Sequence, residues 1–301
     1  MDSGNLKYQF ARLSIAEKLI AVNVFVFIVN GLFTFLMGMP SNSLIRWFEL
    51  PKDFIDFISQ PWSLVTYSFF HGGIWHLFWN MIMLYFSGRI FLNLFGPKKF
   101  ISVYFLGVIL GGLVFLLSYN VFPALLTTNT ALIGASAGVT AVLIFICAYI
   151  PNQEVRLFMF NVKLWYIGAF FVLVDLIQIP SGGNAGGHLA HLGGAFLGYV
   201  YARQLLKGRD IGEGFTKMIE SIEGLFKKKE KKAPLKTVYR RAKGKNVSNV
   251  NYDRESKQRK IDTIYTMEEI GTINYRVDKQ ELFPGLRNSV KLLKENETAT
   301  F

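Results

Sequence analysis

The sequence predicts an all-α membrane protein, a bundle of six transmembrane helices followed by a short basic cytoplasmic tail. About half of the 301 residues are hydrophobic and the mean hydropathy is +0.30, values that point away from a soluble domain. The apolar residues gather into runs close to the ~20 residues that a helix needs to cross a bilayer. The expected spans are 19–39, 76–95, 100–122, 132–150, 164–179 and 187–206.

Basic residues predict the orientation of these spans, because cytoplasmic loops retain Lys and Arg whereas translocated loops tend to lose them. Such residues stand before the first span, near the end of the second and after it, and after the fourth and sixth: Lys7, Arg12, Lys18, Arg89, Lys98, Lys99, Arg156, Lys163, Lys207 and Arg209. Of the opposite loops, 120–131 and 180–186 contain neither Lys nor Arg, and 40–73 balances Arg46 and Lys52 against Glu49, Asp53 and Asp56. We therefore expect a multi-pass protein of the cell membrane with both termini in the cytoplasm.

The chain divides into a cytoplasmic N-terminal segment (1–18), a six-helix domain (19–206) and a basic, partly disordered cytoplasmic region (207–301). The first apolar run is followed by no small-residue cleavage site, so we expect a retained helix rather than a cleaved signal. In the last region, apolar residues at helical spacing over 215–226 indicate either an amphipathic helix on the anionic leaflet or a solvated tail.

The sequence argues against a nucleic-acid-binding protein and against a disulfide-bonded or cysteine-ligated metal protein. Of the 33 Lys and Arg residues, 22 follow Leu206, but the sequence shows no helix or aromatic-basic groove that reads nucleic acid. We therefore expect the lipid bilayer, and no nucleic acid, as a partner. Cys147 has no second cysteine with which to form a disulfide or a thiolate metal site.

Polar side chains mark the outer ends of three expected spans. His76 and Asn80 begin the second span, Ser136 begins the fourth, and His188 and His191 begin the sixth. The predicted orientation brings these three beginnings to the same side of the membrane. Because strongly polar groups are costly in hydrocarbon, residues of this kind usually line a cavity or perform chemistry.

Small residues indicate how a serine and a histidine come together. Gly134 and Gly138 flank Ser136 one helical turn apart, where another helix can approach. Gly194 and Gly198 follow His191 at i+3 and i+7, which places the imidazole above a second seam of small residues. We expect these four glycines to be helix-packing positions that bring His191 onto Ser136.

A serine hydroxyl beside a neutral imidazole is a candidate catalytic pair. The imidazole takes the hydroxyl proton as the oxygen attacks a carbonyl, then returns it to the leaving amine. This chemistry requires no third carboxylate. Asp175, the acid inside the fifth span, is therefore expected to be mainly a structural hydrogen-bonding residue, with membership of a triad as the alternative.

His76 and Asn80 lie one helical turn apart, so their side chains face one direction. Acyl transfer places negative charge on the carbonyl oxygen, and preorganised N–H donors in a site of low dielectric stabilise that charge. These two residues are candidates for an oxyanion site. A polar clasp between helices is the structural alternative.

The four histidines of the chain also raise the possibility of a metal site. His71, His76, His188 and His191 are expected at one depth, and zinc sites use such ligands. However, no Glu accompanies them in a His-Glu-x-x-His arrangement, and a metal gives Ser136 and Asn80 no role. We expect neither a metal nor a cofactor.

Three sequence blocks, 71–80, 134–138 and 188–198, resemble those of the rhomboid family of intramembrane serine proteases. The resemblance covers about 19–206. It implies a six-helix fold, a Ser136 nucleophile paired with His191, and an oxyanion site formed by His76, Asn80 and the backbone N–H of Ser136. It also implies single-span membrane proteins as substrates, cut near their outer ends, and no cofactor.

The sequence departs from the family pattern at two bracing positions. Ser63 follows Trp62 where many members have Arg, and Arg89 follows Gly88 where an acidic residue is common. These departures bear on the stability of the outer loop more than on catalysis. A catalytically silent binding or quality-control protein is the alternative function, and a channel or transporter ranks last because midplane charges and an internal repeat are missing. The sequence specifies neither the substrate nor the oligomeric state.

Overall fold

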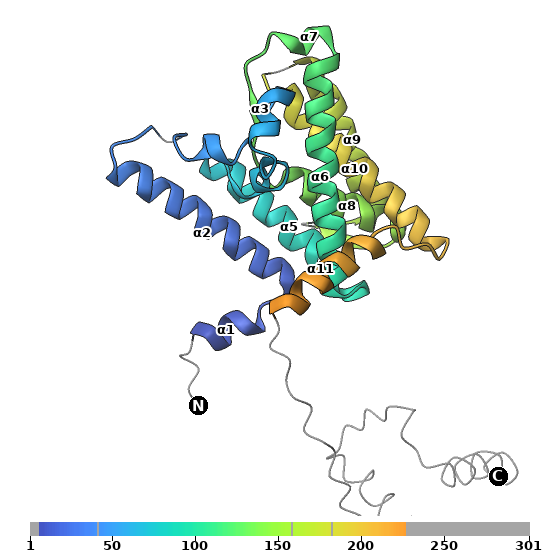
Figure 1. Ribbon diagram of the computed structural model, residues 1–301. Coiled ribbons are helices and arrows are strands. Elements are labelled where there is room, and N and C mark those ends of the chain that lie inside the picture. The colour runs from blue at the N-terminus through green and yellow to red at the C-terminus, as the bar shows by residue number, and fades with distance from the viewer. Residues whose placement is uncertain (1–5, 41, 158, 182, 227–301) are drawn as a thin grey trace, which may run out of the picture. The chain divides into compact units, whose positions relative to one another are not determined.

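The computed structural model describes residues 6–40, 42–157, 159–181 and 183–226. In this part of the chain, helices occupy all six apolar runs, and Figure 1 shows how they are arranged. They are α2 (Ile15–Leu36), α5 (Ile74–Leu94), α6 (Pro97–Val121), α8 (Ser136–Tyr149), α9 (Leu164–Ser181) and α10 (Ala185–Leu206). The predicted bounds agree to within a few residues, except that residues 132–135 precede α8 as a short strand and a turn rather than as helix.

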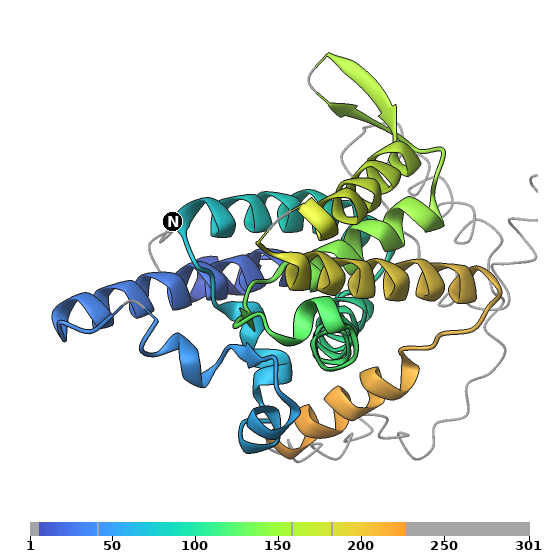
Figure 2. The same cartoon turned by 90° about the horizontal axis from the view of Figure 1, so that it is seen from above.

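Shorter elements connect these helices. Before α5 lie α1 (Leu6–Arg12), η1 (Ile45–Trp47), β1 (Leu50–Pro51), α3 (Phe54–Ser59), α4 (Ser63–Thr66) and η2 (Tyr67–Phe69). After α6 come α7 (Pro123–Leu126), β2 (Ala131–Leu132), β3 (Glu154–Leu157), β4 (Phe160–Lys163) and finally α11 (Glu213–Phe226). The antiparallel hairpin β3–β4 projects from the helices, as seen in Figure 2.

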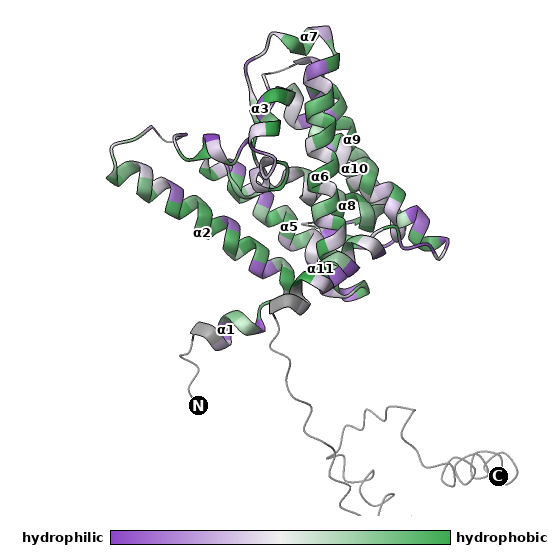
Figure 3. Cartoon of the chain, in the orientation of Figure 1, coloured by the Kyte–Doolittle hydropathy of each residue, from purple (hydrophilic) through white to green (hydrophobic). Residues whose placement is uncertain are grey.

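Length and composition identify membrane-crossing helices. Of the described helices, α2, α6 and α9 are long and apolar enough to cross a bilayer, and α8 is an apolar helix of 14 residues. Figure 3 shows hydrophobic residues along most of α2 and α6. The chain is therefore a multi-pass membrane protein, and crossing by all six helices stays a prediction.

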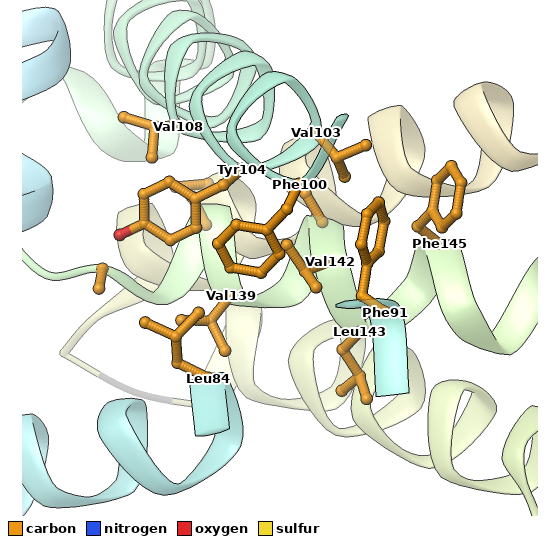
Figure 4. Packing of buried hydrophobic residues seen from close by; sticks show 14 of the residues in the cluster. Leu84, Phe91, Phe100, Val103, Tyr104, Val108, Val139, Val142, Leu143 and Phe145 are labelled. Atoms are coloured by element: carbon orange, nitrogen blue, oxygen red, sulfur yellow. The ribbon is translucent and has the colours of Figure 1, made fainter. Parts of the chain in front are cut away.

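The core lies where α8 packs among α5, α6 and α10. Nearly every residue of α8 from Ala137 to Cys147 is buried, as expected for a helix that is apolar on all sides and enclosed by others. Aromatic rings fill the space between helices, as Figure 4 shows: the Phe91 ring lies 4.9 Å from that of Phe145 and 5.7 Å from that of Phe100. This packing fixes the position of α8, at whose first residue the candidate nucleophile stands.

Glycines of α10 bring its backbone against that of α8. A Cβ added to Gly194 would lie 2.1 Å from the carbonyl oxygen of Ala137, and one added to Gly198 would lie 2.2 Å from that of Ala141. Any side chain at either position would force the helices apart. The sequence correctly identified Gly194 and Gly198 as packing positions.

Of the other two glycines, Gly138 is a helix-packing position as predicted, but against α6, whereas the prediction for Gly134 was wrong. Gly134 and Gly138 do not form a common helical face toward α10, because Gly134 precedes the first turn of α8. Gly138 instead contacts α6, where a Cβ would lie 2.8 Å from side-chain atoms of Tyr104 and Val108. The α8 side of the contact with α10 consists of backbone carbonyls, which a pattern of small residues does not reveal.

Hydrogen bonds brace the outer loop in the absence of the family arginine. The indole N–H of Trp62 donates to the carbonyl of Trp47 at 2.8 Å, and the amide of Asn120 donates to the carbonyl of Lys52 at 2.7 Å. The second bond ties the loop to the end of α6. Ser63, which stands in place of the arginine, is fully buried.

The amphipathic segment predicted after the sixth apolar run is a helix, α11, and it contacts the start of α6. Lys98 forms an ion pair with Glu220, and the hydroxyls of Ser102 and Thr216 lie 2.7 Å apart. The prediction for the remaining tail concerns residues that lie outside the described part of the chain.

Asp210 links α10, α6 and the segment before α11. It accepts a hydrogen bond from the Tyr201 hydroxyl and lies 3.2 Å from the Lys99 ammonium. Burial alone would raise the pKa of Asp210, but its hydrogen bonds from Tyr201, Lys99 and the Gly212 N–H together lower that pKa below its usual value. The charged carboxylate therefore stabilises this junction.

Candidate active site

The turn before α8 is held from three directions. Strand β2 pairs with β1, with Leu132 opposite Leu50. The N–H of Gly134 donates to the carbonyl of Tyr67 at 3.0 Å, and the N–H of Ala135 donates to Nε2 of His71 at 3.4 Å. The outer loop thus fixes the backbone that leads directly into Ser136.

Gly134 is required at this turn for two reasons. Its φ of +115° lies in a region that residues with a side chain rarely adopt. A Cβ there would also lie 2.7 Å from Nε2 of His76 and 3.7 Å from Oγ of Ser136. The His76 ring therefore packs directly against Gly134, close to the serine hydroxyl.

Ser136 and His191 meet as the sequence analysis expected. The Ser136 Oγ lies 2.7 Å from the His191 Nε2, within hydrogen-bonding distance. Ser136 is the first residue of α8, and His191 lies in the second turn of α10. The close backbone contact made by Gly194 and Gly198 brings the two side chains together.

Asp175 of α9 completes a line of polar contacts. Its Oδ1 lies 2.8 Å from Nδ1 of His191 and 2.8 Å from Nδ1 of His188. The side chain is almost fully buried, so both contacts form away from water. Sequence reasoning expected Asp175 to be mainly structural, because helical spacing does not show which side chains of α9 face α10.

The two candidate oxyanion residues lie near Ser136 but differ in their hydrogen bonds. The His76 ring lies against Gly134. The Asn80 amide donates one N–H to the carbonyl of His76 at 2.8 Å, one turn earlier in the same helix, and its NH2 group has a second N–H to donate. The backbone N–H of Ser136 lies in the first turn of α8, where amides have no acceptor within the helix.

A cavity of about 250 Å³ opens beside these groups. It is bounded by α5, α8, α9 and α10, and its lining residues are Trp79, Asn80, Met83, Ser136, Val139, Thr140, Leu143, Phe171, Val174, Asp175 and His191. A slightly larger cavity, about 290 Å³ and lined by residues including Ile15, Leu19 and Phe105, is almost wholly apolar. The first cavity is the candidate active site because it alone of the two borders Ser136 and His191.

His71 has a role at this site that sequence reasoning missed, because it was considered there only as a possible metal ligand. It lies between η2 and α5 and is almost fully buried. Burial, assisted by the nearby His76, lowers the pKa of His71 from 6.5 to about 3, so the ring is neutral near pH 7. A neutral ring can accept the hydrogen bond from Ala135 that holds the turn before Ser136. The two glycines that follow it, Gly72 and Gly73, were the signal in the sequence that His71 belongs to a turn.

The four histidines form two separate pairs rather than one metal cluster. The rings of His71 and His76 lie 5.0 Å apart, and those of His188 and His191 lie 5.7 Å apart. Among the described residues, Asp175, His188 and His191 present ligand atoms within 4.8 Å of one another. Two nitrogens and a carboxylate oxygen suit a divalent cation, but here the same atoms contact one another directly.

Comparison with known proteins identifies the family. The model of the rhomboid domain matches residues 59–208, which include Ser136, His191 and both candidate oxyanion residues. The chain belongs to the rhomboid family. The match also covers the outer-loop residues Tyr67 and His71 that hold the turn before α8.

Several rhomboid proteins are similar to this chain. RHOMBOID-like protein 12, mitochondrial, of Arabidopsis thaliana is 31% identical over 159 residues, covering 49% of this chain and 47% of that protein. Rhomboid protein 1, mitochondrial, of Saccharomyces cerevisiae is 29% identical, covering 50% and 44%. Presenilin-associated rhomboid-like protein, mitochondrial, of Homo sapiens is 30% identical over 191 residues, covering 61% and 46%. The chain thus spans about half the length of the curated relatives it matches.

Proposed function

We propose that this rhomboid protein is an intramembrane serine endopeptidase that cleaves transmembrane-helix substrates near the outer face of the bilayer. The observation that carries the proposal is the 2.7 Å contact between Ser136 Oγ and His191 Nε2 at the edge of a cavity. Rhomboid proteins are generally intramembrane serine proteases, which agrees with this reading.

In the proposed reaction, Ser136 Oγ attacks the scissile carbonyl while His191 Nε2 takes the hydroxyl proton. The tetrahedral intermediate collapses as His191 returns that proton to the leaving amine, and an acyl ester remains on Ser136. A water molecule then attacks the ester, with His191 as the base, and the serine is regenerated. In this last step His191 takes a proton from the water and passes it to Ser136 Oγ as the ester bond breaks, so the imidazole is neutral again for the next turnover.

Negative charge on the carbonyl oxygen is stabilised by donors close to Ser136. The backbone N–H of Ser136 is held in the first turn of α8, and the His76 ring lies against the neighbouring Gly134. The second N–H of the Asn80 amide joins them, while the first bonds the His76 carbonyl. Donors held in a site of low dielectric contribute several kcal/mol to such a transition state.

The site opens toward the side of the membrane opposite the basic ends of the chain. Ser136 and His191 lie in the first turns of α8 and α10, which follow the Lys- and Arg-free loops 120–131 and 180–186. Substrates would be single-span proteins cut near that face, and the basic ends of the chain would lie on the opposite side. The curated relatives carry the word mitochondrial in their names, so they do not support the expected cell membrane.

The orientation is tested in sealed vesicles with a membrane-impermeant maleimide. In a Cys147→Ser background, cysteines placed at the exposed positions Thr128 and Lys207 are expected to react from opposite sides. Reaction of both cysteines from the same side would contradict the proposal that the start of α8 and the end of α10 lie on opposite sides of the membrane.

Cleavage of a transmembrane reporter by the purified protein in liposomes tests the activity. We expect the wild-type chain to cut the reporter and Ser136→Ala to leave it intact. Ser118→Ala is the matched control, because the Ser118 hydroxyl bonds back to the Val114 carbonyl of its own helix. A reporter left uncut by the wild-type chain would favour a catalytically silent binding protein. A reporter cut by Ser136→Ala would contradict Ser136 as the nucleophile.

A further inference from the structure

We infer that Asp175 is a positioning residue for His191, and that His188 holds Asp175 in place. This inference rests on the proposed function and adds two residues to it. The observation is that one carboxylate oxygen of Asp175 lies 2.8 Å from Nδ1 of both histidines. Three helices meet at this point, since Asp175 belongs to α9, the histidines to α10 and Ser136 to α8.

The contact with Asp175 fixes which nitrogen of His191 faces the serine. A carboxylate accepts hydrogen bonds and does not donate them, so Nδ1 of His191 carries the proton directed at Asp175. In the neutral ring this leaves the lone pair on Nε2, which faces Ser136 Oγ at 2.7 Å. Asp175 therefore selects the tautomer that can act as a base.

The same contact acts on the charged form of His191. When His191 takes the serine proton, a positive ring forms 2.8 Å from the carboxylate oxygen, in a region largely removed from water. Opposite charges attract more strongly there than in bulk solvent, which favours the step that forms the imidazolium. The effect depends on the negative charge of Asp175 and not only on its ability to accept a hydrogen bond.

His188 acts only through Asp175. It lies one helical turn before His191, and its ring stands nearly perpendicular to the His191 ring at 83°. Its Nδ1 contacts the Asp175 oxygen, whereas the side chain that contacts the Ser136 hydroxyl is His191. The second hydrogen bond restrains the carboxylate against rotation, so it keeps the oxygen aligned with His191.

A structural clasp between α9 and α10 is the competing explanation, and charge separates the two. Asp175→Asn keeps the shape and a carbonyl oxygen that can accept a hydrogen bond, but removes the charge. A clasp predicts unchanged kcat and a small change in thermal stability. The positioning role predicts that kcat falls by ~10² or more while KM changes by less than about threefold, because the contact matters mainly when the ring is charged.

The experiment measures kcat and KM for reporter cleavage by Asp175→Asn, Asp175→Glu and His188→Gln, with thermal midpoints measured in the same detergent. Asp175→Glu restores the charge on a longer side chain and is expected to recover part of the kcat that Asp175→Asn loses. His188→Gln is expected to lower kcat by about threefold to tenfold. Gln178→Ala, at an exposed position one turn further along α9, is the matched control and should behave as wild type.

The outcomes separate this inference from the proposed function. A wild-type chain that does not cut the reporter overturns the proposed function itself. Wild-type cleavage together with an unchanged kcat for Asp175→Asn overturns the positioning role alone. Should Asp175→Asn fail to fold, His188→Gln decides: kcat lowered threefold to tenfold with an unchanged thermal midpoint supports the positioning role, and an unchanged kcat opposes it.

Discussion

The two histidine pairs lie close to Ser136 but have different neighbours, and the neighbours decide what each pair can do. His71 and His76 lie in and beside a turn, against the backbone of Gly134 and Ala135. His188 and His191 share the carboxylate of Asp175. The first pair therefore shapes the site and faces the expected oxyanion, whereas the second contains the candidate base. The residue type alone does not distinguish these roles.

Removing the candidate base is expected to have the largest effect. His191→Gln should lower kcat/KM for reporter cleavage by about 10⁴ or more, because in the described part of the chain His191 is the side chain whose nitrogen contacts the Ser136 hydroxyl. The matched change in the same pair, His188→Gln, should cost less than tenfold. Equal losses from the two variants would mean that the pair acts as a structural unit.

The position of the second pair depends on the close contact between α8 and α10. Gly194→Ala should destabilise the fold by about 3 kcal/mol or more, because its Cβ would meet the Ala137 carbonyl, which cannot move without its helix. Cleavage should fall as His191 moves away from Ser136. Thermal unfolding in detergent checks this, with Gly31→Ala as the control, since a Cβ at Gly31 meets nothing within 4 Å.

The first pair is tested by the donors to the oxyanion. Asn80→Ala and His76→Ala should each lower kcat by ~10² with little change in KM, because these donors act on charge that forms in the transition state. Asn23→Ala is the matched control, since Asn23 donates to the Leu19 carbonyl as Asn80 donates to that of His76. If Asn80→Ala matches this control in kcat, Asn80 contributes only to its own helix.

The smallest expected effect is the pH dependence caused by His71. Because folding lowers its pKa from 6.5 to about 3, the unfolded chain binds the proton more readily, and stability falls as the pH drops below 6.5. Between pH 7 and pH 5 the loss should be about 2 kcal/mol. His71→Gln keeps an acceptor for the Ala135 N–H but does not titrate, so its folding stability should fall by about 2 kcal/mol less than that of the wild type over this range. The same pH dependence of stability in the wild type and in His71→Gln would contradict burial of a neutral His71 ring.

The sequence predicted the helices and the two central residues because these depend on properties that lie within single segments. Apolar length marked the helical runs, and helical spacing placed His191 above Gly194 and Gly198. The three polar span beginnings, at one depth, indicated that Ser136 and His191 could meet. Their contact at 2.7 Å agrees with that expectation, while their catalytic role stays a prediction.

Features that depend on contacts between segments were not predictable in the same way. Gly134 precedes the helix, and its need for glycine comes from a backbone angle and from the His76 ring beside it. Asp175 faces two histidines of another helix, and the spacing of residues along α9 does not predict that contact. The neutral form of His71 results from the burial of the loop that contains it. Each requires knowledge of which surfaces meet.

The central claim is that Ser136 and His191 act together, and labelling with a serine-directed fluorophosphonate tests it without a substrate. Mass spectrometry of the purified wild-type protein should find the adduct on Ser136, and His191→Gln should remove it while the protein keeps its thermal midpoint. An adduct that forms equally well on Ser136 without His191, or that forms on another serine, would contradict the account.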